Sequence, residues 1–234
     1  MGRIVRLDAA SHGHLGSAVR ERIEQLVLTG AIAAGERVNE LKLAAQLDVS
    51  RGPVREALRA LERAGLLVAI PNRGFFVRKV ALEEALDLYD VRAGLGRVAG
   101  KLVARRISPA QLARLRATHR RMARASAERD VKAYYAANLA FHSQLIDYAG
   151  NPRLAAMSEA VRNELQLYLR DAVGGPGRLK ESQREHDAIL AAIADGDAER
   201  AGAALEDNIL AGKQRMLECL GSSGRAIAGA RLAP

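Results

Sequence analysis

The 234-residue chain is long enough for two domains, and its 49% apolar and 3% aromatic content favours packed helices over sheets. It has no apolar run of the roughly 18 residues that a membrane span needs, no stretch typical of a signal peptide and one cysteine, so we expect a protein of the reducing cytoplasm. The net charge of +9 favours a polyanionic partner such as nucleic acid.

Three helices and a β-hairpin are predicted in the first 80 residues. The helices are expected over residues 15–29, 40–47 and 51–64, and the strands over 66–70 and 75–80. Asn39 and Ser50 stand where they can cap the second and third helix, because their side-chain oxygens can accept bonds from the N–H groups of the first turn. The turn residues Pro71-Asn72-Arg73-Gly74 separate the two strands.

Helical periodicity continues from residue 82 onward, without a strand pattern. Segments near 82–106, 109–127, 131–149, 152–172, 178–195 and 198–219 predict an antiparallel helical bundle. We therefore expect a mainly α fold with three parts. These are a winged helix-turn-helix domain over 13–80, an all-helical domain over 81–220 and a disordered tail over 221–234.

The third helix combines an apolar stripe with a basic face. Apolar residues follow helical spacing on one side, and Arg51, Arg55 and Arg59 are spaced four apart on an adjoining side. Only residues 48–50 join this helix to the preceding one, which is typical of a helix-turn-helix whose second helix enters the major groove. Arginines there can contact guanine edges or phosphate. The alternative, for an isolated helix, is a merely solvated face.

The stretch Val19–Val77 closely resembles the winged-helix domain of the GntR family of bacterial regulators. The matching markers are Gly35-Glu36-Arg37-Val38-Asn39-Glu40, Leu43-Ala44, Val49-Ser50-Arg51, Pro53-Val54-Arg55-Glu56-Ala57-Leu58, Gly65-Leu66 and Asn72-Arg73-Gly74. The resemblance implies DNA contacts from the start of the third helix and from the hairpin, which would act as a wing. Together with the basic face, it gives as expected DNA-binding residues Ser50, Arg51, Gly52, Pro53, Arg55, Arg59, Asn72, Arg73 and Gly74.

This chain departs from the family at two positions of that surface. Gly52 stands where the family usually has Thr or a similar polar residue, so the hydroxyl that could contact DNA there is absent. Leu41, next to Lys42, replaces an Arg that is common in the second helix. The phosphate or base contact of that Arg therefore has no equivalent side chain at position 41.

Residues 82–219 resemble the helical effector domain, called FCD, of the FadR branch of the same family. The landmarks are Tyr89-Asp90-Val91-Arg92, Asn138-x-x-Phe141-His142, Gly150-Asn151-Pro152, Glu185-His186 and Gly196-Asp197. In that branch an Asp and three His commonly line a cavity and hold a divalent metal, which can bind an effector carboxylate. The corresponding positions here are Asn138, His142, His186 and Asn208, so amides replace the Asp and the third His.

Several interpretations of these four residues stay open. They hold one divalent transition metal (Zn, Ni or Mn), weakly because amides bring no charge, or they hydrogen-bond an effector directly. The simplest alternative is that His142 and His186 are core residues without a ligand. Arg92 stands where the family often places an inward arginine, which would clamp a carboxylate, and its alternative is a solvated surface position.

We expect a homodimeric regulator that binds an inverted repeat in double-stranded DNA, represses transcription and responds to a small organic acid or sugar acid. One rival is a metal-dependent enzyme using Glu185 beside His186, and another is an architectural DNA-binding protein without an effector. No nucleotide cofactor is expected, because the glycine-rich run Gly94–Lys101 lacks the Walker A spacing. His119, on an arginine-rich helix, is expected to face solvent.

Overall fold

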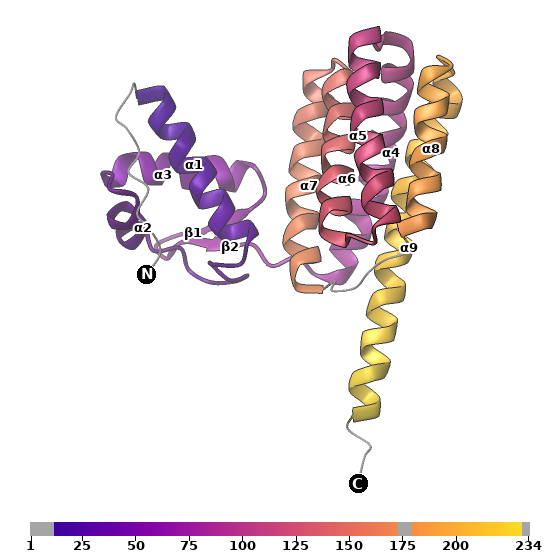
Figure 1. Ribbon diagram of the computed structural model, residues 1–234. Helices are drawn as coiled ribbons and strands as arrows, with labels where there is room; N and C mark the ends of the chain where they lie inside the picture. Colours follow the sequence, from indigo (N-terminus) through magenta and orange to yellow (C-terminus); the bar gives the residue numbers. More distant parts are fainter. Residues whose placement is uncertain (1–11, 173–178, 231–234) are drawn as a thin grey trace. The chain divides into compact units, whose positions relative to one another are not determined.

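The computed structural model describes residues 12–172 and 179–230, which fall into two compact units (Figure 1). The first contains the described chain up to Ala85 together with Glu159–Asp171, and the second contains Leu86–Ser158 with the described residues from Ala172 onward. Within these ranges, no helix is both long and apolar enough to cross a membrane. The predicted fold class, a winged helix-turn-helix followed by a helical bundle, is confirmed.

Helices and a two-stranded antiparallel sheet form the N-terminal part of the first unit. In chain order they are α1 (His12–Leu28), α2 (Glu40–Leu47), α3 (Arg51–Arg63), β1 (Leu67–Ile70) and β2 (Gly74–Val77). The strands pair in the register Leu67 with Val77, which leaves the turn residues at the tip of the hairpin. The sequence therefore predicted the type and order of all these elements.

The sheet has an addition that the sequence analysis did not predict. The segment before α2 runs beside β2, where Val38 N–H donates to the Phe75 carbonyl at 2.9 Å and Gly35 N–H donates to the Val77 carbonyl at 2.9 Å. Val77 N–H in turn donates to the Glu36 carbonyl at 3.0 Å. These bonds tie the α1–α2 connection to the wing, so the wing is held on one side by backbone pairing.

Local capping chemistry fixes the turn between α2 and α3. Asn39 Oδ1 accepts a hydrogen bond from Lys42 N–H at 3.0 Å, as predicted for an N-cap. Asp48 ends α2 in the left-handed conformation (φ 54°), and its N–H returns to the Ala44 carbonyl. Ser50 has the extended backbone of an N-cap, but its side chain makes no capping hydrogen bond. The Ser50 hydroxyl is therefore not used in holding α3.

The apolar stripe of α3 anchors the helix in the core of the first unit. Val54, Leu58 and Leu61 are 0% exposed, and α3 packs on α1, where Val19 and Ile23 are also completely buried. Burying a side chain of this size is worth about 1.5–3 kcal/mol. The polar side of α3 is consequently directed away from this core.

Part of α7 (Pro152–Ala172) belongs to the first unit. Arg78, which follows β2, donates to Glu164 Oε2 at 2.5 Å and also pairs with Glu84. Gly65 ends α3 at φ +76°, and a Cβ added there would lie 2.6 Å from Glu164 Oε1. Gly65 is thus required by its backbone conformation, and the Glu164 side chain occupies the space that a Cβ would take.

Long helices make up the second unit. They are α4 (Leu82–Arg106), α5 (Pro109–Ala127), α6 (Val131–Tyr148), α8 (Leu179–Ala194) and α9 (Ala198–Ala230), with the start of α7. Ser108 and Gln111 form a capping box at the start of α5, and Asp130 caps α6. Helix α5 packs on α6 and α8, and α8 packs on α9. The predicted bounds of these helices are close to the observed ones, except at the end of α9.

The glycine-rich run Gly94–Lys101 lies inside α4, where Gly100 allows close packing against α9 and Gly94 has open space around it. A Cβ added to Gly100 would lie 2.5 Å from the Ala201 carbonyl oxygen, and one added to Gly202 would lie 2.9 Å from the Arg97 carbonyl oxygen. Helices α4 and α9 therefore approach backbone to backbone. This close approach accounts for Gly100 of α4 and Gly202 of α9.

Helix α9 continues past its expected end. The composition of residues 221–234 predicted a disordered tail, but the structure describes helix up to Ala230, and residues 231–234 lie outside the described range. The extension contains no proline before residue 231 and several alanines, the residue with the highest helix propensity. An established helix adds such residues more easily than a new one starts.

Candidate nucleic-acid interface and polar cluster

Arg51, Arg55 and Arg59 form an exposed basic face on α3. All three are solvent-exposed, while the opposite side of the helix is buried in the core. Among the described residues, Arg51 has one weak ion pair, 3.7 Å from its Nη2 to Glu40 Oε2, and its side chain stays 63% exposed. The side chains of this basic face are therefore available to an external partner.

The start of α3 is also open. Gly52 has no neighbour closer than Ser50 Oγ, at 4.0 Å from an added Cβ, so the position has room for a side chain. Pro53 lies in the first turn, where its missing N–H removes no helical hydrogen bond. The free N–H groups of a helix N-terminus attract a phosphate. The predicted residues Ser50, Gly52 and Pro53 thus stand beside the basic face.

The wing presents the other predicted residues at its tip. Asn72 (φ 60°) and Gly74 (φ 91°) both adopt left-handed conformations, which Asn and Gly tolerate best. Arg73 is exposed, and its guanidinium carbon lies 5.5 Å from the centre of the Phe76 ring. On α2, Leu41 is 64% exposed where the family commonly has Arg. The first unit therefore carries cationic groups on α3 and the wing, and on α2 it offers the exposed Lys42 beside Leu41 in place of that Arg.

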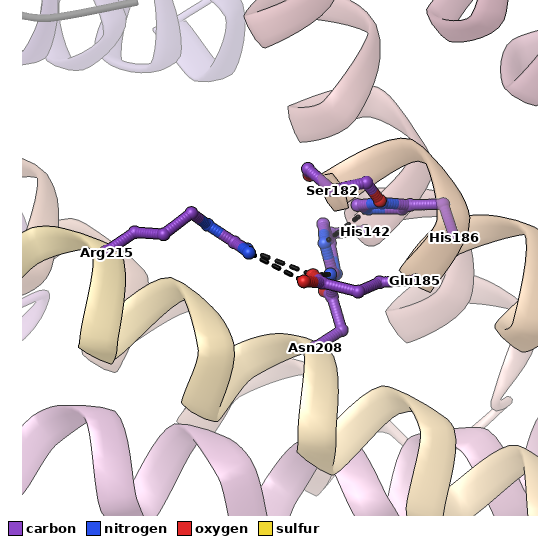
Figure 2. A network of polar contacts seen from close by, with 6 residues as sticks. All are labelled: His142, Ser182, Glu185, His186, Asn208 and Arg215. Carbon is purple, nitrogen blue, oxygen red and sulfur yellow. Dashed lines mark hydrogen bonds and ion pairs between the residues drawn. The ribbon is translucent and has the colours of Figure 1, made fainter. Parts of the chain in front are cut away.

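In the second unit, His142 of α6 and His186 of α8 face each other. Their Nε2 atoms are 3.3 Å apart, and His186 Nδ1–H donates to the Ser182 carbonyl at 2.6 Å (Figure 2). This bond fixes the neutral tautomer of His186 with its Nε2 lone pair directed at His142. A backbone carbonyl that orients a histidine in this way is typical of histidines that present Nε2 to a ligand.

Burial favours the neutral form of both imidazoles. It lowers the pKa of His142 well below the usual value, helped by the neighbouring His186 and by the positive charge of Arg92, while a hydrogen bond with Asn208 opposes the shift. Burial also lowers the pKa of His186, against the bond to the Ser182 carbonyl and the charge of Glu185, which raise it. The pair therefore offers lone pairs and N–H donors rather than charge.

An ion pair with an amide lies next to the histidines. Arg215 of α9 donates to both Glu185 oxygens, at 2.6 and 3.0 Å, and Asn208 Nδ2 donates to Glu185 Oε2 at 2.7 Å (Figure 2). Asn208 is 5% exposed. Glu185 was predicted as part of the Glu185-His186 landmark and as a possible catalytic acid or base, and in the structure it is engaged with Arg215. Arg215 was missed, although its seven-residue spacing from Asn208 places the two on one helical face.

Three buried side-chain atoms of α6 complete no hydrogen bond, and they are Tyr134 Oη, Asn138 Oδ1 and Gln144 Oε1. The Ser182 side chain lies near enough to Tyr134 to lower the pKa of its hydroxyl, against the burial that raises it. Asn138 is one helical turn from both Tyr134 and His142, so the three residues share a face of α6. Unpaired buried polar atoms are rare in folded proteins, and each one requires an explanation such as a ligand.

Arg92 of α4 belongs to the same region. Its guanidinium carbon lies 6.0 Å from the centre of the Tyr89 ring, and its charge lowers the pKa of His142. Of the five residues predicted to bind an effector, the structure thus brings His142, His186 and Asn208 together, with Asn138 one turn from His142 and Arg92 near enough for its charge to act on the pKa of His142.

His119 does not face solvent as expected. Its Nε2 lies 2.7 Å from Asp187 Oδ1 and 2.9 Å from Gln183 Nε2, so α5 contacts α8 through polar groups here. The Phe141 ring lies 6.3 Å from the His119 ring and 5.2 Å from the His186 ring. The arginine-rich composition of α5 concealed this inward position.

The atoms of the cluster that could bind a metal are two imidazole nitrogens and an amide oxygen, all of them neutral ligands. Two nitrogens bound at about 2.0–2.1 Å to a tetrahedral ion lie about 3.3–3.4 Å apart, which matches the separation of His142 Nε2 and His186 Nε2. The unpaired Asn138 Oδ1 is the third candidate. In the described part of the chain, no three His, Cys, Asp or Glu residues come together as a metal site. Any metal here would therefore rely on two imidazoles and amide oxygen.

Families of known proteins match both parts of the chain. The profile of the bacterial regulatory proteins of the gntR family matches residues 15–77, and that of the FCD domain matches residues 87–211. The chain is 29% identical to a probable D-xylose utilization operon transcriptional repressor of Paenarthrobacter nicotinovorans, over 84% of this chain and 86% of that protein. It is 27% identical to the uncharacterized HTH-type transcriptional regulator YdhC of Bacillus subtilis, over 77% and 81%. The structure of E. coli McbR/YncC matches with a TM-score of 0.72 at 25% identity, over 87% of this chain and 97% of that one.

Proposed function

Because the chain belongs to the GntR family of bacterial regulatory proteins and carries an FCD domain, we propose that it represses transcription at a specific operator and leaves that operator when a small carboxylate binds its helical unit. It is a transcriptional regulator with a DNA-binding domain of the GntR type. To this role the proposal adds that the chain binds a specific sequence, represses transcription, responds to an effector, acts in the cytoplasm and belongs to the FadR branch. Repression is supported by the relative from P. nicotinovorans, which is described as a probable repressor.

The observation that carries the DNA-binding part is the exposed basic face of α3 on a helix whose other side is fully buried. A helix anchored in this way can lie in a major groove, with its first residues at the base edges. Arg51 and Arg55 stand in the first turns, where bidentate contacts to guanine are possible. The open helix N-terminus and Arg73 of the wing supply contacts to phosphate and to the minor groove.

Selection from a pool of random DNA duplexes tests this part. We expect the full chain to enrich an inverted repeat, and a gel-shift titration to show weaker binding to a scrambled duplex of the same composition. Enrichment of no motif, with strongly salt-sensitive binding to every duplex, would support the rival function of an architectural DNA-binding protein.

The polar cluster around His142 supports the effector part of the proposal. Neutral imidazoles, the unpaired Asn138 oxygen and the nearby Arg92 suit a ligand with a carboxylate and hydroxyl groups. Acetate, lactate, citrate and gluconate are suitable probes. At least one of them is expected to raise the melting temperature of the chain and to weaken its gel shift on the selected duplex. If all four change neither quantity, small carboxylates are not the effectors.

A resident divalent metal is a second form of the same proposal. His142 Nε2, His186 Nε2 and Asn138 Oδ1 would hold it, and a bound metal would supply a positive charge for the effector carboxylate. A competition titration with a zinc chelator measures the affinity. Loss of zinc binding in His142→Ala is expected if these residues hold the metal, and unchanged binding would exclude them.

A homodimer completes the proposed regulator, because an inverted repeat presents two equal half-sites. Val91 and Val98 are 50% and 45% exposed on one face of α4, and Gly94 between them has open space around it. Two copies of α4 that cross in opposite directions at Gly94 would bring Val91 of one copy opposite Val98 of the other. Light scattering should therefore give a dimer mass for the native chain and a monomer mass for Val98→Glu. A dimer mass for this variant would exclude this face.

A further inference from the structure

We infer that Arg215 and Asn208 form a carboxylate-binding cradle that Glu185 fills in the ligand-free chain, and that the carboxylate of the effector takes the place of Glu185. The inference rests on the proposed function and adds which groups hold the ligand and which contact the ligand breaks. It concerns only residues of the second unit.

The geometry of the cradle is that of a carboxylate site. Three N–H groups converge on one carboxylate: Arg215 Nη1 at 2.6 Å, Arg215 Nη2 at 3.0 Å and Asn208 Nδ2 at 2.7 Å. Both donor residues project from one face of α9, so a single helix positions the whole set. A planar guanidinium fork with an added amide is specific for a carboxylate in geometry as well as in charge.

The carboxylate that now fills the cradle comes from another helix. Glu185 is on α8, directly before His186, so the contact joins α8 to α9 (Figure 2). The Arg215 and Glu185 side chains are 21% and 26% exposed, so water and small solutes reach the pair. Exchange with an external carboxylate replaces one charge-assisted contact with an equivalent one. Its cost in electrostatic energy is therefore small compared with breaking the pair.

The unpaired atoms on α6 indicate what else the ligand carries. Tyr134 Oη and Asn138 Oδ1 are buried without hydrogen bonds, and Tyr134 lies close enough to Glu185 and Arg215 for their charges to act on its pKa, which burial raises. A hydroxyl group next to the carboxylate of a ligand could accept from Tyr134 and donate to Asn138. The inferred ligand class is consequently a hydroxy acid.

Exchange would also change the contact between helices. With an external carboxylate in the cradle, Glu185 no longer links α8 to α9, and His186 loses its charged neighbour. The ligand therefore acts on the α8–α9 contact through a single displaced side chain. This is a discrete two-state change, of the kind that ligand control requires.

Removal of Glu185 tests the cradle directly. Glu185→Ala is expected to lower the melting temperature by about 3–6 °C, because it leaves the Arg215 charge partly buried and unpaired. Added acetate or formate should restore most of this loss, whereas chloride at the same ionic strength should not. Glu185→Gln keeps the cradle occupied and should show no recovery with acetate.

A matched control is one of the ion pairs that join α9 to α4. Glu206 Oε2 accepts from Arg97 Nη1 at 2.6 Å, but that pair is exposed. Glu206→Ala should gain no stabilisation from acetate. If Glu185→Ala responds to acetate no more than Glu206→Ala or the native chain, the cradle does not bind an external carboxylate and the inference is overturned.

The hydroxyl preference is tested with glycolate against acetate. Glycolate should bind to Glu185→Ala at least tenfold more tightly than acetate does. Adding Tyr134→Phe to this variant should remove most of that difference in affinity. Equal affinities for glycolate and acetate would overturn the assignment of a hydroxy acid. The native chain should need a higher concentration of glycolate than Glu185→Ala for the same rise in melting temperature. Arg215→Met should abolish the rise.

Gel shifts on the selected duplex separate this inference from the proposed function. If glycolate or gluconate releases DNA from both the native chain and Arg215→Met, effector control stands and the cradle fails. If Glu185→Ala recovers stability with acetate but no carboxylate changes DNA binding, the cradle stands and effector control fails.

Discussion

In the first unit, the arginines of α3 lie on the surface, whereas in the second unit the polar side chains around His142 are buried or half-buried and bond mostly to one another. The first arrangement suits a large polyanion, because long cationic side chains stay mobile in water until a partner neutralises them. The second suits a small ligand, because a buried group without a partner is costly and gains much from a matching one. The two regions should therefore respond to different substitutions.

Arg55→Ala should produce the largest effect and should be confined to the first unit. If Arg55 contacts a base, the affinity for the selected duplex falls by about 1–3 kcal/mol, or roughly 5- to 150-fold. The melting temperature should be unchanged, because no hydrogen bond or ion pair of Arg55 occurs among the described residues. Fluorescence anisotropy measures the affinity. Arg114→Ala, which removes an exposed arginine of α5, serves as the control and should leave affinity nearly unaltered.

Restoring the acidic ligand and the third histidine ligand of the family should strengthen zinc binding in the second unit. The double variant Asn138→Asp and Asn208→His adds a negative charge and an imidazole beside His142 and His186, so zinc affinity should rise at least tenfold. Chelator competition measures it against the native chain. No gain in zinc affinity would mean that these positions do not converge on one ion.

Arg92→Met tests the charge next to the cluster. A charge-assisted hydrogen bond is worth about 1.5–3 kcal/mol, so carboxylate probes that stabilise the native chain should bind roughly tenfold or more weakly. Arg97→Met, also on α4 but in an exposed ion pair, is the matched control and should leave binding unchanged. Equal losses in both variants would show a general effect of charge on α4.

Gly52→Thr should produce the smallest effect, and it should be a gain. The position is open, and Thr would supply the hydroxyl that the family usually has there. One added hydrogen bond to phosphate is worth about 0.5–1.5 kcal/mol, which corresponds to a gain in DNA affinity of about two- to tenfold. Gly52→Val, which has the same branched shape without the hydroxyl, is the control. A gain shared by both variants would reflect helix propensity.

Features encoded by local spacing were predictable from the sequence. The apolar stripe and basic face of α3, the Asn39 cap and the bounds of α5 all depend on residues within a few positions of one another. The pairing of Val38 with Phe75 and the bonds of Glu185 to Arg215 join segments far apart in the chain. Periodicity within one segment carries no information about such partners, which is why these contacts were missed.

His119 and the end of α9 show two further limits. An arginine-rich helix suggested a solvated face, but a single residue can turn inward toward a partner such as Asp187. The tail composition suggested disorder, but the residues up to Ala230 continue a helix that had already formed. At His119 and at the end of α9, the prediction from the average composition of the segment was therefore wrong for the individual residues.

The most direct test of the account is the ratio of affinities for the selected duplex and its scrambled form, measured for the native chain and for the double variant Arg51→Ala and Arg55→Ala. Base contacts from α3 predict a large ratio for the native chain, of at least about a thousandfold, and a ratio that approaches one in the variant. A variant that binds both duplexes more weakly but keeps the native ratio would contradict the claim that α3 selects the operator.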